Sequence, residues 1–89
     1  MIRLFVRHQV ADFVKWKKAY DDFDAERATL GVRGHQVFRS AEDANDVTVW
    51  HDFVDLGAAK AFVANPRLRE VMDAAGVVGT PQLWFAQEA

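Results

Sequence analysis

An imperfect internal repeat constrains the fold of this chain more than any other feature of its sequence. The segment from His8 to Asp12 closes one strand-like stretch, and the segment from His51 to Asp55 closes another. In each segment an apolar residue follows the histidine by two positions, and an aspartate that suits the start of a helix follows by two more. Each unit therefore reads strand, helix, strand, and two units predict one α+β domain of βαββαβ order over residues 1–89.

The composition predicts a globular domain with more apolar surface than a small core needs. Hydrophobic residues make up 51% of the 89 residues, with three Trp and seven Phe among them. A domain of this size buries only roughly 60% of the surface that its unfolded chain exposes. We therefore expect part of the apolar surface to be buried against a second copy of the chain.

Charge and residue usage argue against several classes of protein. The formal net charge of -2 gives no basic face for nucleic acid, and the absence of cysteine removes disulfides and thiolate chemistry. No apolar run approaches the roughly 20 residues that span a membrane. Met1 leads directly into an apolar strand without a basic segment or a small-residue cleavage site, so we expect a cytoplasmic protein.

Hydrophobic periodicity predicts where the strands and helices lie in the sequence. Alternating side chains predict strands over 2–10, 33–40, 47–54 and 82–87. Apolar residues at helical spacing predict one helix from the Asp12 cap to Gly31, with a solvated face of charged residues, and a second from Asp55 to Gly76. Asn65-Pro66 should interrupt the second helix, since Asn caps a helix and Pro suits its first position. Residues 76–81 are expected to form a mobile loop.

Right-handed connections between these elements give a ferredoxin-like sheet of strand order 4-1-3-2, with both helices on one face. The alternation leaves four large aromatic side chains on the other face: Phe5, Phe38, Trp50 and Trp84. An exposed face this rich in aromatic residues marks an interaction surface. We predict that two copies pack sheet against sheet as a two-fold homodimer.

The chain resembles the antibiotic biosynthesis monooxygenase-like family, of the dimeric α+β barrel superfamily. The resemblance lies in Arg7-His8, in Asp12-Phe13-x-x-Trp16 and in the segment 65–81, and it covers nearly the whole chain. It implies a ferredoxin-like fold, a homodimer and a substrate pocket between the helices and the sheet. Haem-degrading enzymes, isomerases and polyketide cyclases share the superfamily.

Three histidines are candidate catalytic bases: His8, His51 and His35. An imidazole has the right pKa range for proton transfer near neutrality. Each lies on the helix side of its strand, where the alternative is a buried histidine with a purely structural role. His8 and His51 should lie on the order of 10 Å or more apart, because their strands are antiparallel. They cannot share a metal ion, and only His35 and His51 should lie close together.

The expected pocket has a wall of further residues. Aromatic side chains on the helices and the loop valines should contact a substrate, although such aromatic residues are more often plain core: Trp16, Tyr20, Phe62, Val77 and Val78. The Tyr20 hydroxyl needs a hydrogen-bond partner if it is buried. Haem-degrading relatives bind iron through a histidine on the second helix, but residues 56–75 contain none. We predict no metal, haem or other cofactor.

Three functions are compatible with the sequence. The resemblance implies a cofactor-independent monooxygenase acting on a small phenol- or quinol-type substrate, in which a histidine removes a proton before the substrate reduces dioxygen. The second function is a non-redox dimer of the same fold, either cyclase-like or a small-ligand-binding protein. The third is a structural dimer with a filled core. Oxygen consumption separates the first two, and cavity volume tests the third.

Overall fold

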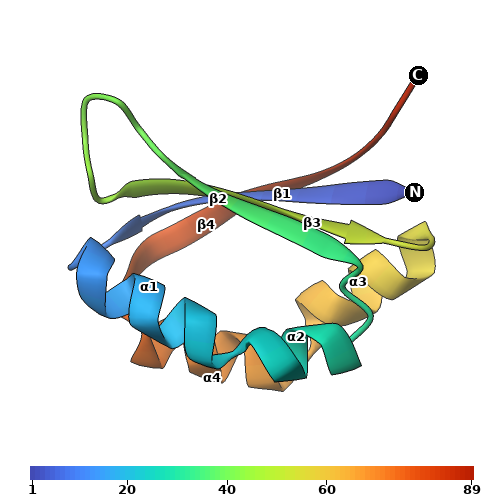
Figure 1. Ribbon diagram of the computed structural model, residues 1–89, viewed down its shortest axis with the longest axis horizontal. Coiled ribbons are helices and arrows are strands. Elements are labelled where there is room, and N and C mark those ends of the chain that lie inside the picture. The colour runs from blue at the N-terminus through green and yellow to red at the C-terminus, as the bar shows by residue number, and fades with distance from the viewer.

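The computed structural model describes all 89 residues and has the predicted order, with each expected helix divided in two. The eight elements are β1 (Ile2–Val10), α1 (Phe13–Asp22), α2 (Asp24–Thr29), β2 (Gly34–Arg39), β3 (Asp46–Phe53), α3 (Leu56–Ala64), α4 (Pro66–Ala74) and β4 (Val77–Gln87). The sheet lies on one side and all four helices cover its other face, as Figure 1 shows. No helix has both the length and the apolar character needed to cross a bilayer.

The sheet confirms the predicted topology. Its strands run antiparallel in the order β2-β3-β1-β4, so β1 and β3 lie at the centre. Phe5 pairs with Trp50 on one side and with Trp84 on the other. Since alternate residues face opposite sides of a strand, this register aligns the aromatic side chains of the three strands on the face without helices.

Side-chain caps fix where three of the helices begin, as the sequence predicted. The carboxylate of Asp12 accepts hydrogen bonds from the backbone N–H groups of the first turn of α1, at 3.0 and 3.3 Å. Asp55 caps α3 through the N–H of Ala58 at 2.8 Å, and Asn65 caps α4 just before Pro66. Gly31 and Gly76 follow helix ends with φ of 96° and 85°, the left-handed backbone that glycine adopts without strain.

The expected single helix from residue 13 to Gly31 is interrupted, and that prediction was wrong in this respect. Phe23 separates α1 from α2, with φ of -84° and ψ of 0°. Its N–H is shared between the carbonyl groups of Ala19 and Tyr20 at 3.2 and 3.3 Å, a tightening that is common at helix ends. The Phe23 ring is buried in the core, so packing favours the break over continuous helical geometry.

The loop expected at residues 76–81 is also wrong, because β4 already begins at Val77. Val77 pairs with Val10 and Val78 pairs with Gln9, so the two β-branched residues extend the edge strand. The register then shifts: three residues, from Gly79 to Pro81, lie opposite His8 alone. Gly79 supplies a φ of 74° and Pro81 lacks an N–H, which suits a bulge at a sheet edge.

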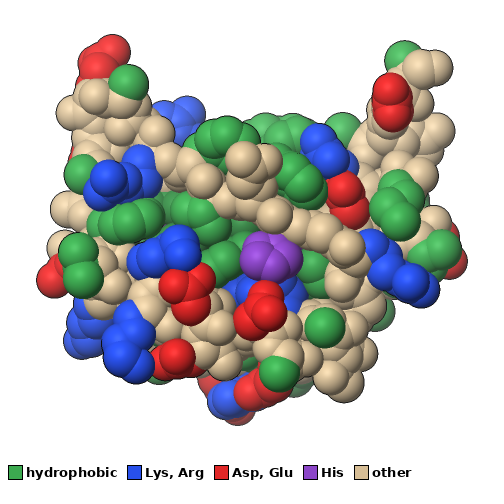
Figure 2. Space-filling model, viewed as in Figure 1, with side chains coloured by type: hydrophobic (Ala, Val, Ile, Leu, Met, Phe, Trp, Pro, Cys, Tyr) green, Lys and Arg blue, Asp and Glu red, His purple; other side chains and the backbone are tan.

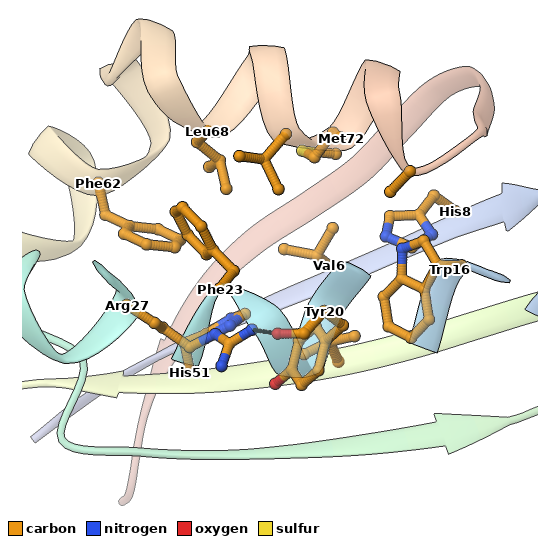
Figure 3. A pocket seen from close by; sticks show the side chains of 13 residues that line it. Val6, His8, Trp16, Tyr20, Phe23, Arg27, His51, Phe62, Leu68 and Met72 are labelled. Atoms are coloured by element: carbon orange, nitrogen blue, oxygen red, sulfur yellow. Dashed lines mark hydrogen bonds between the residues drawn. The ribbon is translucent and has the colours of Figure 1, made fainter. Parts of the chain in front are cut away.

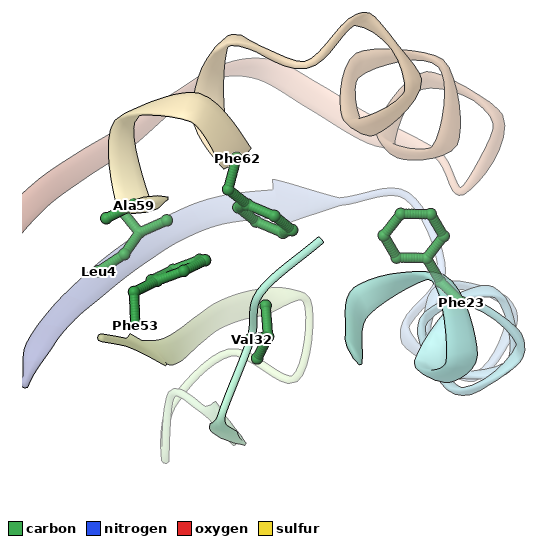
Figure 4. Close-up of a cluster of buried hydrophobic side chains, with 6 residues drawn as sticks. All are labelled: Leu4, Phe23, Val32, Phe53, Ala59 and Phe62. Atoms are coloured by element: carbon green, nitrogen blue, oxygen red, sulfur yellow. The ribbon is translucent and has the colours of Figure 1, made fainter. Parts of the chain in front are cut away.

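The core between helices and sheet consists of two clusters. The first, drawn in Figure 4, joins six buried side chains: Leu4, Phe23, Val32, Phe53, Ala59 and Phe62. The second joins Val10, Trp16, Val47, Val49 and Ala75. Phe53 is fully buried, so truncating it to alanine should cost about 3–5 kcal/mol of stability. The two clusters stabilise opposite ends of the layer, and the candidate site lies between them.

The face without helices combines aromatic rings with ion pairs. The rings of Phe5 and Trp84 stack with centroids 5.4 Å apart. The Arg3 guanidinium lies 3.7 Å above the Trp50 ring and binds Asp52 through two hydrogen bonds of 2.8 and 3.0 Å. Phe38 and Trp84 remain 47% and 46% exposed. This face retains the apolar surface on which the prediction of a homodimer depends.

Candidate functional site

A cavity of about 60 Å³ lies between the helices and the sheet. Figure 3 shows side chains from both layers converging on it, with α4 on one side and the strands on the other. Its wall comprises thirteen residues: Val6, His8, Trp16, Tyr20, Phe23, Arg27, Val49, His51, Phe62, Leu68, Val71, Met72 and Ala75. The wall is mostly apolar, and its basic groups are two imidazoles and one guanidinium.

The structure brings together most of the residues singled out from the sequence. His8, His51, Trp16, Tyr20 and Phe62 all line the cavity. His35 does not line it. Val77 packs against the second core cluster and Val78 is 53% exposed, so neither borders the cavity. The two valines do not lie in the mobile loop expected from the sequence, because they pair with β1 as strand residues.

His51 lies at one end of the cavity and is 6% exposed. Its ring packs against Phe62 at 5.3 Å, Tyr20 at 6.2 Å and His35 at 6.1 Å between ring centroids. Its Nδ1 atom is buried and has no hydrogen-bond partner. Burial, reinforced by the positive charge of Arg27 and by His35, lowers the pKa of His51 to about 3. At neutral pH this imidazole is therefore uncharged.

His8 lies at the other end, opposite the bulge in β4. It is 7% exposed, its ring is T-shaped against Trp16 with centroids 5.5 Å apart, and its Nδ1 atom also lacks a partner. Burial lowers the pKa of His8, while the backbone of His8 itself and, to a smaller extent, the Asp46 carboxylate oppose that shift. His8 pairs with Val47 whereas His51 pairs with Leu4, so four residues, or roughly 13 Å of strand, separate the two positions.

Arg27 is the charged residue of the site that the sequence prediction missed; the α4 residues Leu68, Val71 and Met72 were also not assigned to it. The Arg27 side chain is 2% exposed, and its guanidinium lies 3.8 Å above the Tyr20 ring. It donates to the Asp24 carboxylate at 3.1 Å and to the backbone carbonyl of Tyr20. A signal was present, because positions 16, 20, 23, 27 and 30 continue one helical stripe and Arg27 is the charged residue within it.

Tyr20 links the cavity to the protein surface, and the partner expected for its hydroxyl is His35. The hydroxyl lies 2.6 Å from Nδ1 of His35, and Nε2 of the same ring lies 3.1 Å from the Asp24 carboxylate. These contacts fit a hydroxyl that donates to Nδ1 and a ring that donates from Nε2. Burial raises the pKa of Tyr20 to about 12. Figure 2 shows a histidine at the surface beside acidic side chains. Of the three histidines, His35 is the exposed one, whereas His8 and His51 are buried.

His35 and His51 lie opposite each other in the pairing of β2 with β3, as the sequence predicted for this pair. Nothing beside them completes a metal site. No group of three or more His, Cys, Asp or Glu side chains is arranged to hold a metal ion. The arrangement offers instead an uncharged imidazole at each end of an apolar cavity and a buried cation at one of those ends.

Comparison with known proteins identifies the fold. No family model and no curated protein matches the sequence. Among solved structures, a candidate antibiotic biosynthesis monooxygenase from Bordetella bronchiseptica superposes with a TM-score of 0.85 at 15% identity, over 99% of this chain and 96% of that one. SnoaB, a cofactor-independent oxygenase from Streptomyces nogalater, gives 0.76 at 17% identity, over 99% and 94%.

A third structure, of an antibiotic biosynthesis monooxygenase, gives a TM-score of 0.78 at 8% identity and covers 100% of this chain and 99% of that one. Identities this low establish the fold alone. The chain has the ferredoxin-like fold of the antibiotic biosynthesis monooxygenases over its whole length, and structures with that fold include a cofactor-independent oxygenase.

Proposed function

We propose that this protein is a cofactor-independent monooxygenase that acts on a small phenol- or quinol-type substrate at the cavity between helices and sheet. The observation that carries the proposal is a pair of buried imidazoles in the cavity wall, His8 and His51, each with an unpartnered Nδ1 atom. A neutral imidazole in an apolar site can accept a proton from an acidic hydroxyl or an activated C–H group. The fold shared with a cofactor-independent oxygenase supports the same chemistry.

His8 is the better base of the two. A general base works best when its pKa lies near the working pH. The positive charge of Arg27 lowers the pKa of His51 further, whereas the backbone of His8 and the Asp46 carboxylate act to raise the pKa of His8. His8 therefore keeps more of its basicity after burial. In the proposed reaction it removes the proton and leaves a substrate anion in the cavity.

The reaction balances without a cofactor. The substrate anion gives one electron to dioxygen, and the resulting radical and superoxide combine through a new C–O bond. The peroxide takes a proton and loses water to leave a carbonyl. For a phenol with a free ring position, the sum is phenol plus O₂ giving quinone plus H₂O. One oxygen atom enters the product, and the protonated histidine returns its proton to the water that leaves.

The cavity is smaller than an aromatic substrate needs. A volume of about 60 Å³ is far below the several hundred Å³ of a typical ligand site, and benzene needs about 150 Å³. An aromatic ring enters only if side chains move. Leu68 and Met72 of α4 line both the cavity and a larger outer groove with Thr80 and Pro81, so they are the side chains whose displacement would admit a ring edge.

Oxygen consumption tests the proposal directly. Purified protein, treated with a chelator, is mixed with a panel of phenols, hydroquinones and polycyclic quinols under an oxygen electrode. We expect uptake of one O₂ per quinone formed, with one ¹⁸O atom of ¹⁸O₂ in the product when a C–H group is oxidised. Uptake no faster than autoxidation across the panel would contradict the proposal.

Two alternative functions use the same fold. A non-redox small-ligand-binding or cyclase-like dimer needs the same cavity but no dioxygen. A structural dimer needs no cavity, and a volume of about 60 Å³ is closer to its filled core than to an aromatic pocket. Ligand binding detected by calorimetry or NMR, together with no oxygen uptake, would favour the ligand-binding or cyclase-like alternative. A cavity that binds no compound of the panel would favour a purely structural role.

A further inference from the structure

The volume of the cavity limits what it can hold without rearrangement. One water molecule needs roughly 10–15 Å³ of such space, so about 60 Å³ accommodates a few waters or one molecule of two to four heavy atoms. Dioxygen and the small anions derived from it fit that limit, and an aromatic ring does not. The co-substrate of the proposed reaction is thus better matched to the cavity than the organic substrate is.

The polarity of the wall differs between the two ends. At the His51 end, the Arg27 guanidinium is almost fully buried, and its two side-chain hydrogen bonds account for only two of its five N–H donors. Its ion-pair partner Asp24 is 69% exposed and lies on the outer side. The unpartnered Nδ1 of His51 belongs to the same end. Figure 3 shows the two side chains close to each other beside Tyr20.

A buried cation with free donors next to apolar walls suits a molecule that enters neutral and becomes negative. Dioxygen is apolar and needs no desolvation, while an anion formed from it meets the positive charge of Arg27 in a medium of low dielectric constant, where the attraction is stronger than in water. At the other end, His8 contacts Trp16, and Arg27 is the one Lys or Arg side chain that lines the cavity. The cavity therefore separates a position for proton transfer from a position for negative charge.

We propose that the Arg27–His51 end of the cavity is the subsite for dioxygen, and that Arg27 is a further catalytic residue, the counter-charge of the superoxide formed there. The identification of the anion as superoxide rests on the proposed function. The electron comes from the substrate anion that His8 produces. Superoxide then forms the C–O bond with the substrate radical, and the peroxide that results keeps its negative charge near Arg27 until it is protonated.

Three variants test this subsite. Arg27→Met keeps an unbranched apolar stem and removes the guanidinium with its charge, whereas Arg27→Lys keeps the charge. Lys17→Met removes a charge from the exposed face of α1 and serves as the control. Circular dichroism and thermal unfolding first establish that each variant is folded. The turnover number with the best substrate of the panel should fall on the order of 10²-fold in Arg27→Met, as when one oxyanion donor is removed from an enzyme. Arg27→Lys should recover part of the loss, and Lys17→Met should match the wild type.

Azide, a small anion with three atoms, provides a readout that does not need turnover. Titration with sodium azide at constant ionic strength, followed by NMR of the three histidine rings, should shift the His51 resonances more than those of His8 and His35. The shift should disappear in Arg27→Met and persist in Lys17→Met. Absence of a His51 shift at 100 mM azide in the wild type, or an equal shift in Arg27→Met, would overturn the small-anion site.

The two proposals fail separately. If the protein oxygenates quinols and Arg27→Met retains the wild-type turnover number, the assignment of Arg27 is wrong and the proposed function stands. If azide binding depends on Arg27 but no substrate is oxygenated, the proposed function fails and with it the assignment of the anion as superoxide.

Discussion

His8 and His51 occupy equivalent positions in the internal repeat, yet their surroundings give them different chemistry. Both rings are buried on the helix side of the sheet, and both have an unpartnered Nδ1 atom. His51 has Arg27 and His35 nearby, which reinforce the effect of burial on its pKa, whereas His8 has Trp16 on its ring and the Asp46 carboxylate in reach of its charge. Equivalent positions in the repeat thus predict burial of both histidines, and residues outside the repeat give the two rings different electrostatic surroundings.

The largest expected effect is a difference in turnover number between variants of the two histidines. His8→Gln should lower the turnover number by 10²-fold or more, because a general base contributes about 10²–10⁴-fold. His51→Gln should have a smaller effect, and His35→Gln should remain close to the wild type, since His35 does not line the cavity. The three rates are measured with one quinol at pH 7. Equal and small losses in all three variants would remove the distinction and favour the non-redox alternative.

A substitution on the face of the sheet without helices tests the predicted dimer interface, which lies away from both ends of the cavity. We predict that the wild type is a two-fold homodimer at micromolar concentration and that Trp84→Glu weakens it at least 30-fold or renders the chain insoluble, because a charge replaces a large aromatic side chain at the expected centre of the interface. Trp50→Glu should act in the same way. Light scattering and sedimentation velocity measure the association.

Ala25→Glu adds the same charge to an exposed position of α2 and is the matched control for that experiment. It should leave the dimer intact. A wild type that sediments as a monomer at micromolar concentration would contradict the interface assigned to Phe5, Phe38, Trp50 and Trp84.

The pH dependence of the unfolding free energy tests whether the fold keeps His51 uncharged. The folded-state pKa of about 3 lies below the ordinary value of 6.5, so below pH 6.5 the unfolded chain binds a proton that the folded chain does not. The stability that depends on an uncharged His51 is therefore fully present above pH 6.5, and it is lost as the pH falls from 6.5 towards 3. This one group should remove about 2 kcal/mol of the free energy of unfolding between pH 8 and pH 5.

Urea denaturation at the two pH values measures the loss, and His51→Gln is the comparison. In that variant the pH dependence should shrink by most of this amount, leaving the smaller contribution of His8, whose pKa is lowered in the same direction. An unchanged pH dependence in His51→Gln would show that His51 is not held neutral by the fold.

The sequence predicted the fold well because its signals are local. The alternation in each strand, the Asp12, Asp55 and Asn65 caps and the two glycines after helices each depend on a few neighbouring residues. The site was predicted less fully because it depends on packing. Val77 and Val78 were assigned to a loop on account of the flanking glycines, although their pairing with β1 fixes them in a strand.

Arg27 shows most clearly what the hydrophobic pattern of the sequence cannot predict. A charged residue within an apolar stripe is ordinarily placed in solvent, and only the fold shows that a cation–π contact with Tyr20 and an ion pair with Asp24 stabilise it inside. The volume of the cavity was likewise outside the reach of periodicity, because it depends on how completely the side chains of α4 fill the layer.

The smallest expected effect concerns the link between the His51 end and the surface. Tyr20→Phe keeps the ring beneath Arg27 but removes the hydroxyl that binds Nδ1 of His35, so it should cost about 1 kcal/mol of stability and change turnover by only a few-fold. Urea denaturation measures the cost. Because Tyr20 is the only tyrosine, its pKa of about 12 is also directly visible: absorbance at the tyrosinate band should stay low at pH 11 while the protein is folded and rise on unfolding. A normal titration near pH 10 in the folded protein would mean that the hydroxyl is not buried against His35. The His51 end of the cavity would then not be linked to the surface through Tyr20 and His35.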